Sequence, residues 1–344
     1  MVQFGTVPDL LVLVLNSGSS SIKFALYKMP QEDRALAGTL TDVAETAQRL
    51  DGAHQPDLIG HRLVHGGPSH SAPQLVTQSL ISDLRALIPL APNHLPRQLD
   101  AMEQMAKLYP AARQVACFDT AFHRRMPPLA QLYALPEPLR RDGMLQRYGF
   151  HGLSYEYICA ELSKRNQLNG RVVICHLGNG ASMAAVRDGQ PIDTTMGLTP
   201  TGGLVMGTRC GDLDPEVVLF LMEEKGLTVA QARAAITEQG GMLGISGISG
   251  DMRELHAREL NDPTARMAID AFCYSACKAV AALSAALGGL DRIVFTGGIG
   301  ENDEKVRLRI CEGVRFLGPV QVDVIPTNEE LMIARHAAAI ALSA

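Results

Sequence analysis

The sequence contains no tryptophan, and aromatic residues make up only 5% of the chain. It also has no run of basic residues: 31 Lys and Arg stand against 36 Asp and Glu, for a net charge of −5. Proteins that bind nucleic acids gather cations on one surface and often interleave them with stacking aromatics. We therefore expect no nucleic-acid partner.

The seven cysteines are scattered and form no C-x-x-C pair. Without such pairs a disulfide framework or a zinc site is disfavoured, and a reducing, cytoplasmic setting is expected.

Long apolar runs are scarce as well. Leu10–Leu15 is too short to cross a membrane and follows no basic segment, while Met267–Leu290 is interrupted by Asp270 and Lys278. We interpret the longer run as a core helix and expect no membrane partner.

What the chain does have is an alternation of strand-like and helix-like segments in 344 residues, 47% of them hydrophobic, which favours an α/β protein of two domains. One plan occurs in each half: an apolar strand, a tip of small residues and a second strand. It covers Leu11–Leu15, Asn16–Ser21 and Ile22–Tyr27, and again Arg171–Leu177, Gly178–Gly180 and Ala181–Val186. This echo predicts a duplicated architecture.

Capping and turn signals place further elements. Asp262-Pro263 predicts the start of a long helix that stops at Gly288, and Asp188-Gly189 predicts a hairpin turn. Thr327 with Glu330 predicts a capping box for a C-terminal helix that packs on the first domain. Other expected strands are Leu58–His65, Gln114–Asp119, Arg292–Thr296 and Val322–Ile325. The expected domains are 1–122 with 331–344, and 123–330.

Three tips rich in glycine or serine follow apolar strands, at Asn16–Ser21, Gly178–Gly180 and Gly297–Asn302. Small residues let backbone N–H groups approach anionic oxygens, so three such tips favour a nucleotide site over simple turns. No G-x-x-x-x-G-K-[ST] motif is present, and Asp303 replaces the last glycine of a dinucleotide motif.

Three cations accompany these tips: Arg62 on a strand, Arg209 between two glycines, and His151 next to Gly152. Phosphoryl transfer needs positive charge around the transferred group, which such residues supply. We interpret the neighbouring His61 and His65 as structural.

Two carboxylates are candidates for magnesium or substrate. Asp119 ends a strand, and Glu329 opens the last helix. Glu330 is assigned to the capping box, which leaves Glu329 for the metal. A helix-start acid favoured by the helix dipole is the competing interpretation of the glutamate.

Together these segments resemble the acetokinase (acetate kinase) family, within the acetate and sugar kinase/Hsp70/actin superfamily. The matching segments are 13–24, 60–67, 117–123, 147–152, 176–182, 206–215, 296–302 and 326–331, in family order. The resemblance implies two RNase-H-like domains that close over the site, a homodimer, and reversible ATP-dependent phosphorylation of a short-chain carboxylate such as acetate. It also implies Mg²⁺, for which Mn²⁺ can substitute.

The resemblance further implies roles for individual residues. The catalytic group would be Arg62, Asp119, His151 and Arg209. Asn16 and Glu329 would hold the metal. The nucleotide would contact Lys23, His176, Leu177, Gly178, Asn179, Gly180, Asp251, Met252, Arg253, Gly298, Ile299, Gly300, Glu301 and Asn302.

The expected acyl pocket is where the sequence departs from the family. It would be lined by Arg62, Val64, Asn93, Phe150 and Pro200. Leucine and asparagine are exchanged within Pro92–Pro96, the family's Leu-Glu pair is replaced within Thr199–Leu204, and Tyr155 stands where histidine is usual.

The segment between Lys23 and Arg62 is also shorter than is usual in the family. A propionate or butyrate kinase therefore stays open as an alternative. A non-catalytic ATP-binding module is disfavoured, because the catalytic set is complete.

Overall fold

The computed structural model describes residues 9–17, 22–50 and 54–343. Most of the expected tip Asn16–Ser21 therefore lies outside the described residues. The chain divides into two compact units. Unit 1 comprises Met1–Arg124, Gly152–Tyr157 and Asn328–Ala344, and unit 2 comprises Arg125–His151 and Ile158–Thr327. Gly152–Tyr157, which we had expected in the second domain, thus falls in unit 1.

Unit 1 is built on a six-stranded sheet of order β3-β2-β1-β4-β6-β5. Its strands are β1 Leu10–Ser17, β2 Ile22–Met29, β3 Asp33–Leu40, β4 Leu58–Leu63, β5 Gln74–Leu75 and β6 Arg113–Phe118. β1 and β2 form the expected antiparallel hairpin, whereas β1, β4 and β6 run parallel. The carboxyl ends of those three strands therefore meet at one edge of the sheet.

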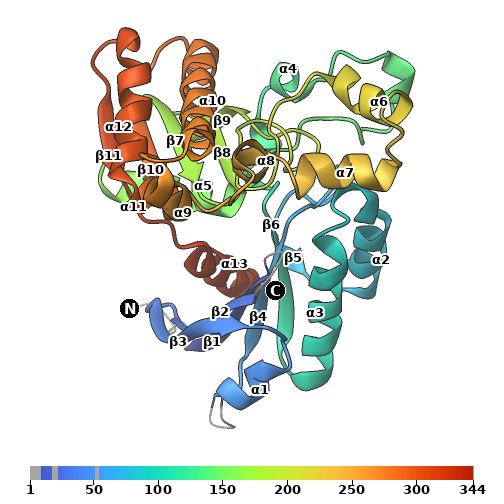
Figure 1. Ribbon diagram of the computed structural model, residues 1–344. Coiled ribbons are helices and arrows are strands. Elements are labelled where there is room, and N and C mark those ends of the chain that lie inside the picture. Colours follow the sequence, from blue (N-terminus) through green and yellow to red (C-terminus); the bar gives the residue numbers. More distant parts are fainter. Residues whose placement is uncertain (1–8, 18–21, 51–53, 344) are drawn as a thin grey trace. The chain divides into compact units, whose positions relative to one another are not determined.

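Helices cover both faces of this sheet (Figure 1). They are α1 Glu45–Arg49, α2 Gln78–Ala86, α3 Leu95–Leu108 and α13 Glu329–Ser343. Alternate residues of β1 separate the two layers: Val12 and Val14 pack with Ile333 of α13, and Leu13 and Leu15 pack in the cluster that contains Met105 of α3. The run of apolar residues in β1 follows from burial on both faces.

The C-terminal helix thus packs on unit 1, as expected. Its close approach requires Gly60 on β4, because a Cβ there would lie 2.5 Å from Ile333 Cγ2. The expected capping box is wrong. Asn328 is the cap, since its Oδ1 accepts from the backbone N of Leu331 at 2.9 Å.

Unit 2 repeats the topology in a five-stranded sheet of order β11-β10-β7-β8-β9. Its strands are β7 Arg171–Leu177, β8 Ala181–Arg187, β9 Gln190–Thr194, β10 Arg292–Thr296 and β11 Gln321–Val324. In both units an antiparallel three-strand meander continues into two parallel strands, which confirms the duplication. Asp188 and Gly189, with φ of 50° and 77°, make the expected hairpin turn.

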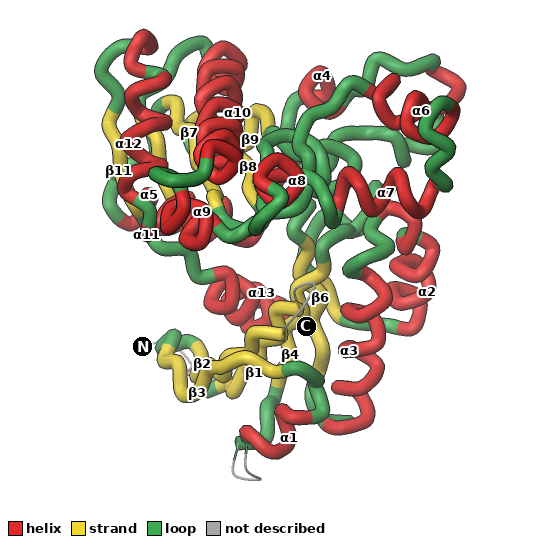
Figure 2. Tube along the Cα trace, viewed as in Figure 1, coloured by secondary structure: helices red, strands yellow, loops and turns green. Residues whose placement is uncertain are grey.

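Most of the α-helices, drawn in red in Figure 2, belong to unit 2. They are α4 Pro128–Gln131, α6 Pro215–Glu223, α7 Val229–Thr237, α8 Gly241–Ser246, α9 Met252–Arg258, α10 Pro263–Leu287, α11 Gly297–Asn302 and α12 Glu304–Gly313, and α5 Gly152–Lys164 begins in unit 1. Short 3₁₀ turns occur at Ile88–Leu90, Phe122–Arg125, Glu137–Leu139 and Arg315–Leu317.

The long apolar run forms α10, with Asp262 as its N-cap and Gly288 as its left-handed C-cap, as expected. Among the described residues it is the one helix whose length and composition would also suit a membrane span. Phe272 and Ile269 on this helix are fully buried, in agreement with a core helix.

Candidate functional site

A polar cluster lies in unit 1 at the edge where β1, β4 and β6 end. Asn16 and Arg62 are the penultimate residues of β1 and β4, and Asp119 directly follows β6. Asp119 and Asn16 are only 1% and 5% exposed. The sheet topology therefore brings together three residues that the sequence had singled out separately.

The Arg62 guanidinium is the centre of this cluster. Its Nη2 and Nε donate to the Asp119 carboxylate at 2.7, 3.0 and 3.1 Å, and its Nη1 donates to Asn16 Oδ1 at 2.9 Å. Burial lowers the pKa of Arg62, but the Asp119 and Glu329 carboxylates outweigh it and raise that pKa above its usual value. Arg62 is thus a permanently charged group held in one orientation.

Two glutamates from the first turn of α13 complete the cluster. Asn16 Nδ2 donates to Glu329 Oε2 at 3.0 Å and to Glu330 Oε1 at 2.9 Å. Glu329 Oε2 is also 3.8 Å from Arg62 Nη1. The sequence had assigned Glu330 to helix capping, but its carboxylate faces Asn16 beside Glu329.

The charge balance shifts the titration of Asp119. Burial raises its pKa, Arg62 opposes that effect, and Glu329 adds to it, so that the pKa rises from 3.8 to about 6. Three carboxylates here face one guanidinium, which leaves the cluster with an excess of negative charge once all three are ionised.

The carboxylate oxygens of this cluster are of the kind that binds a magnesium ion. Mg²⁺ in phosphoryl-transfer sites is held by one or two carboxylates together with substrate phosphates. Glu329 can supply such an oxygen, whereas Asn16 Oδ1 accepts from Arg62 and so serves as a bridge. The described residues contain no group of three or more His, Cys, Asp or Glu side chains arranged for a metal.

The second cluster lies in unit 2, around the tip between β7 and β8. A Cβ on Gly180 would lie 2.5 Å from Arg209 Nη2 and 3.4 Å from His151 Nε2, so both side chains approach the tip closely. Arg209 Nη1 donates to the Pro200 carbonyl at 2.6 Å.

His151 is fixed in a left-handed backbone conformation, with φ of 57°. Its Nδ1 is 2.8 Å from the buried Ser182 hydroxyl, and its ring stacks on His176 at 4.3 Å. Its Nε2 is therefore directed toward the Gly180 tip. The sequence analysis did not single out Ser182. It stands two residues after Gly180, and its hydroxyl is the feature that could have indicated a hydrogen-bond partner for a site residue.

The other expected nucleotide segments also belong to unit 2. The third tip is not an open loop but the short helix α11, and Gly298 N lies 3.8 Å from where a Cβ on Gly178 would stand. The Gly297–Asn302 tip thus follows its strand as expected, takes helical form, and comes close to the Gly178–Gly180 tip.

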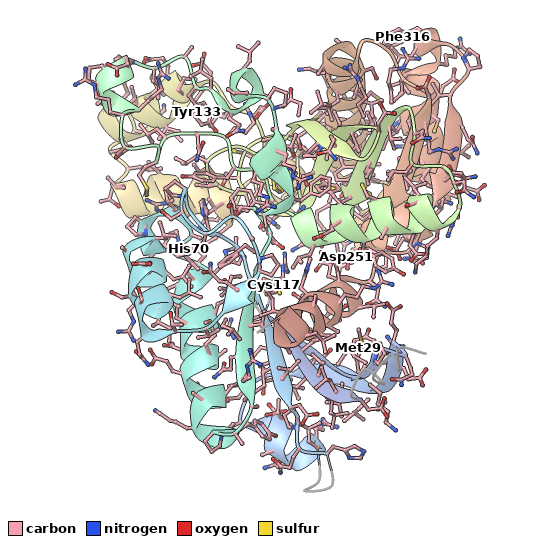
Figure 3. The ribbon with its side chains drawn as sticks, turned by 180° about the vertical axis from the view of Figure 1, so that it is seen from behind. Met29, His70, Cys117, Tyr133, Asp251 and Phe316 are labelled. Carbon is pink, nitrogen blue, oxygen red and sulfur yellow. The ribbon has the colours of Figure 1, made fainter. Side chains whose placement is uncertain are left out.

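Several residues that were expected to contact the nucleotide form hydrogen bonds within the protein or are buried in it. Glu301 Oε1 accepts from the backbone N of Gly297 and of Thr327, at 2.9 and 3.0 Å. Asp251, labelled in Figure 3, caps α9 and pairs with Arg253 at 2.6 Å. Met252 is buried, and Ile299, Gly300 and Asn302 lie within α11. Lys23 is an exposed residue of β2 in unit 1.

The residues expected to line the acyl pocket differ in exposure. Asn93 is exposed in the turn before α3. Val64 is buried, and its backbone N–H donates to Gln98 Oε1 at 3.1 Å. Val64 and Asn93 belong to unit 1, and Phe150 and Pro200 to unit 2.

The two neighbouring histidines are structural in their environment, as interpreted. His61 is 2% exposed, with Nε2 2.6 Å from Gln114 Oε1. Burial lowers its pKa to about 4, so the ring is neutral at physiological pH. β4 ends at Leu63, so His65 lies beyond the strand, where its Nδ1 accepts from Gly67 N at 2.9 Å.

A family model described as "Acetokinase family" matches residues 35–323. The chain belongs to the acetokinase family. It is similar to the acetate kinase of Rhodopseudomonas palustris strain TIE-1, with 42% identity, covering 95% of this chain and 97% of that protein.

Two solved acetokinase-family structures extend the likeness. The acetate kinase of Porphyromonas gingivalis is 35% identical with a TM-score of 0.86, covering 96% of this chain and 100% of that one. The propionate kinase of Francisella tularensis is 33% identical with a TM-score of 0.89, with the same coverage. Membership of the acetokinase family confirms the resemblance and the α/β fold of its superfamily.

Proposed function

We propose that this chain transfers the γ-phosphoryl group of ATP to the carboxylate of acetate, giving ADP and acetyl phosphate. The transfer is direct, in line and reversible. Membership of the acetokinase family and the likeness to two proteins named acetate kinase support this activity. The observation that carries the proposal is the Arg62 guanidinium, 15% exposed and held by Asp119 at the carboxyl ends of three strands.

Such a reaction requires positive charge around the transferred phosphoryl group. Charge spreads over the three equatorial phosphoryl oxygens in the transition state, and preorganised donors stabilise it. Arg62 in unit 1, and Arg209 and His151 in unit 2, supply such donors. Because Asp119 and Ser182 hold two of these groups in place, little reorganisation is needed at the moment of transfer.

The nucleotide phosphates would be bound by the Gly178–Gly180 tip with His176 beside it. Gly180 brings the backbone close to Arg209, which a larger residue would prevent. Bound Mg²⁺ would neutralise charge on the phosphate oxygens, and Glu329, oriented by Asn16, is the residue placed to hold it.

Propionate is the second candidate acceptor. A solved propionate kinase has a TM-score of 0.89 to this chain, and Thr201 and Gly202 replace a bulkier pair usual in the family. One methylene in an apolar pocket changes discrimination by only about 1–3 kcal/mol, so a modest change in shape can reorder the two acids.

The test is hydroxylamine trapping of acyl phosphate from ATP, Mg²⁺ and acids of increasing chain length. We expect acetate to give the highest kcat/KM and propionate to follow. A higher value for propionate would assign the chain to the alternative. The absence of acyl phosphate with every acid would contradict the proposed function.

We also propose that the protein forms a homodimer, as the family resemblance implies. Apolar side chains on α6 and at the start of α7 support an interface in unit 2, since Phe220 is 51% and Val229 59% exposed. Sedimentation of the protein at several concentrations tests this. The cytoplasmic location stays a prediction.

A further inference from the structure

His256 lies on α9 with a carboxylate at each ring nitrogen. Its Nδ1 is 2.9 Å from Glu259 Oε2, and its Nε2 is 2.9 Å from Asp303 Oδ2. The side chain is only 15% exposed, and its two partners are 12% and 17% exposed. Neutral imidazole has a single N–H, so only the protonated ring donates to both carboxylates.

Further charged side chains surround this cluster. Glu259 also pairs with Arg309, whose Nη1 donates to Asp270 on α10 at 3.1 Å. Burial raises the pKa of Glu259, but hydrogen bonds from His256 and Arg309 outweigh it and hold that pKa below its usual value. The carboxylates of Glu259 and Asp303 thus flank the imidazole ring, and Arg309 pairs with Glu259.

The cluster joins two segments that the resemblance assigns to the nucleotide. α9 begins directly after Asp251, one of the expected nucleotide contacts. Asp303 caps α12, where its Oδ1 accepts from Val306 N at 3.0 Å, and it directly follows α11. Arg307 of α12 then donates to the carbonyls of Gly300 and Glu301, both at 3.0 Å. Hydrogen bonds therefore connect His256, through Asp303 and Arg307, to the carbonyls of α11.

We infer that His256 is a positioning residue for ATP, which through its contact with Asp303 ties α9 to the α11–α12 segment. This rests on the proposed function only in that ATP is taken as the nucleotide. The consequence is that loss of the His256–Asp303 contact releases α9 from the α11–α12 segment and lowers the affinity for ATP.

The experiment is equilibrium binding of ATP by calorimetry with the full-length wild type, His256→Gln and Asp303→Asn. We expect His256→Gln and Asp303→Asn each to raise the Kd for ATP about threefold to tenfold, because each removes the contact between α9 and Asp303. Adding Asp303→Asn to His256→Gln should change little further, because both remove the same contact.

The matched control is His336→Gln. His336 also contacts a carboxylate, Glu156 at 2.8 Å, but it lies on α13 in unit 1. It should leave the Kd for ATP unchanged. In steady state, His256→Gln should raise the KM for ATP while kcat and the KM for the acid stay within about twofold.

Unchanged ATP binding in both His256→Gln and Asp303→Asn would overturn the inference, as would an equal loss in His336→Gln. A parallel rise of both KM values would overturn it too, because that pattern marks general distortion. If the two variants lose affinity for ATP as expected but the wild type makes no acyl phosphate, the proposed function fails and the role of His256 stands.

Discussion

At the scale of single residues, Asp119 is the group whose titration should be visible in activity. Its carboxylate holds Arg62, and its pKa is raised to about 6. As pH falls below about 6, the Asp119 carboxylate takes a proton and its ion pair with Arg62 weakens. We therefore expect kcat to decline. Asp119→Asn should have low activity and no such acid limb. A pH–rate profile of both proteins checks this.

The stability of the fold should respond in the opposite direction. The folded pKa of Asp119 is above its unfolded value of 3.8. Its contribution to the free energy of unfolding is therefore fully present below pH 3.8 and is lost as pH rises through about 6.

For the pH–rate profile, an acid limb with the same midpoint in Asp119→Asn would show that another group controls kcat.

Arg62 and Arg209 should act in the transition state more than in ground-state binding. Loss of one preorganised donor costs about 10²–10³ in rate, roughly 2.7–4 kcal/mol. Arg62→Ala and Arg209→Ala should therefore lower kcat far more than they raise the KM for ATP. Steady-state kinetics decide this, with Arg85→Ala as the control, since Arg85 is a surface residue paired with Glu103. Survival of kcat within about threefold would contradict the assigned role.

At the scale of elements, the start of α13 shows which residue caps the helix. Asn328 accepts from Leu331 N and also from the Tyr27 hydroxyl at 3.2 Å, so it anchors α13 on β2. Thr327 Oγ1 is buried and has no hydrogen-bond partner in the described part of the chain. We expect Asn328→Ala to cost about 0.5–2 kcal/mol of unfolding free energy and Thr327→Val to be nearly neutral. Denaturant titration measures the unfolding free energy of both variants. An equal loss in the two would support the capping box of Thr327 and Glu330 that the sequence predicted.

The turn between β7 and β8 is a second element with a constrained residue, Gly180. Gly180→Ala would place a methyl group 2.5 Å from Arg209 Nη2, the far end of a flexible side chain. The side chain can move aside, so we expect stability to change by less than about 0.5 kcal/mol. The displaced guanidinium should lower kcat about tenfold or more. Kinetics and thermal melts together check this, and an unchanged kcat would mean that Arg209 acts from another position.

At the scale of the whole molecule, unit 1 is assembled from three separate segments of the chain. Its core needs α13, whose Ile333 is fully buried against the face of β1 that carries Val12 and Val14. Ile333→Ala should therefore cost about 2–5 kcal/mol. Ile340→Ala, on the same helix but only partly buried, should cost less. Chemical denaturation of both variants tests whether the far C-terminal segment stabilises the N-terminal sheet, and similar losses would argue against it.

Local signals in the sequence were sufficient for most elements. The apolar β1, the hairpin at Asp188-Gly189 and the caps of α10 could be predicted, because each depends on residues that are neighbours in the chain. The repeated strand–tip–strand plan was likewise visible, and so was the set of polar residues at strand ends. Family motifs added roles for these residues that pattern alone leaves open.

Contacts between distant segments were decided only by the tertiary structure. That Asn16, Arg62 and Asp119 form one cluster depends on β1, β4 and β6 running parallel. That Glu330 joins Glu329 beside Asn16 depends on where α13 lies, which no local capping rule contains. The exposure of Asn93 and the bridge from His256 to Asp303 have the same origin. Hydrogen bonds and burial across long sequence separations are set by packing, so the sequence alone determined which residues are candidates for the chemistry and the fold determined which of them meet.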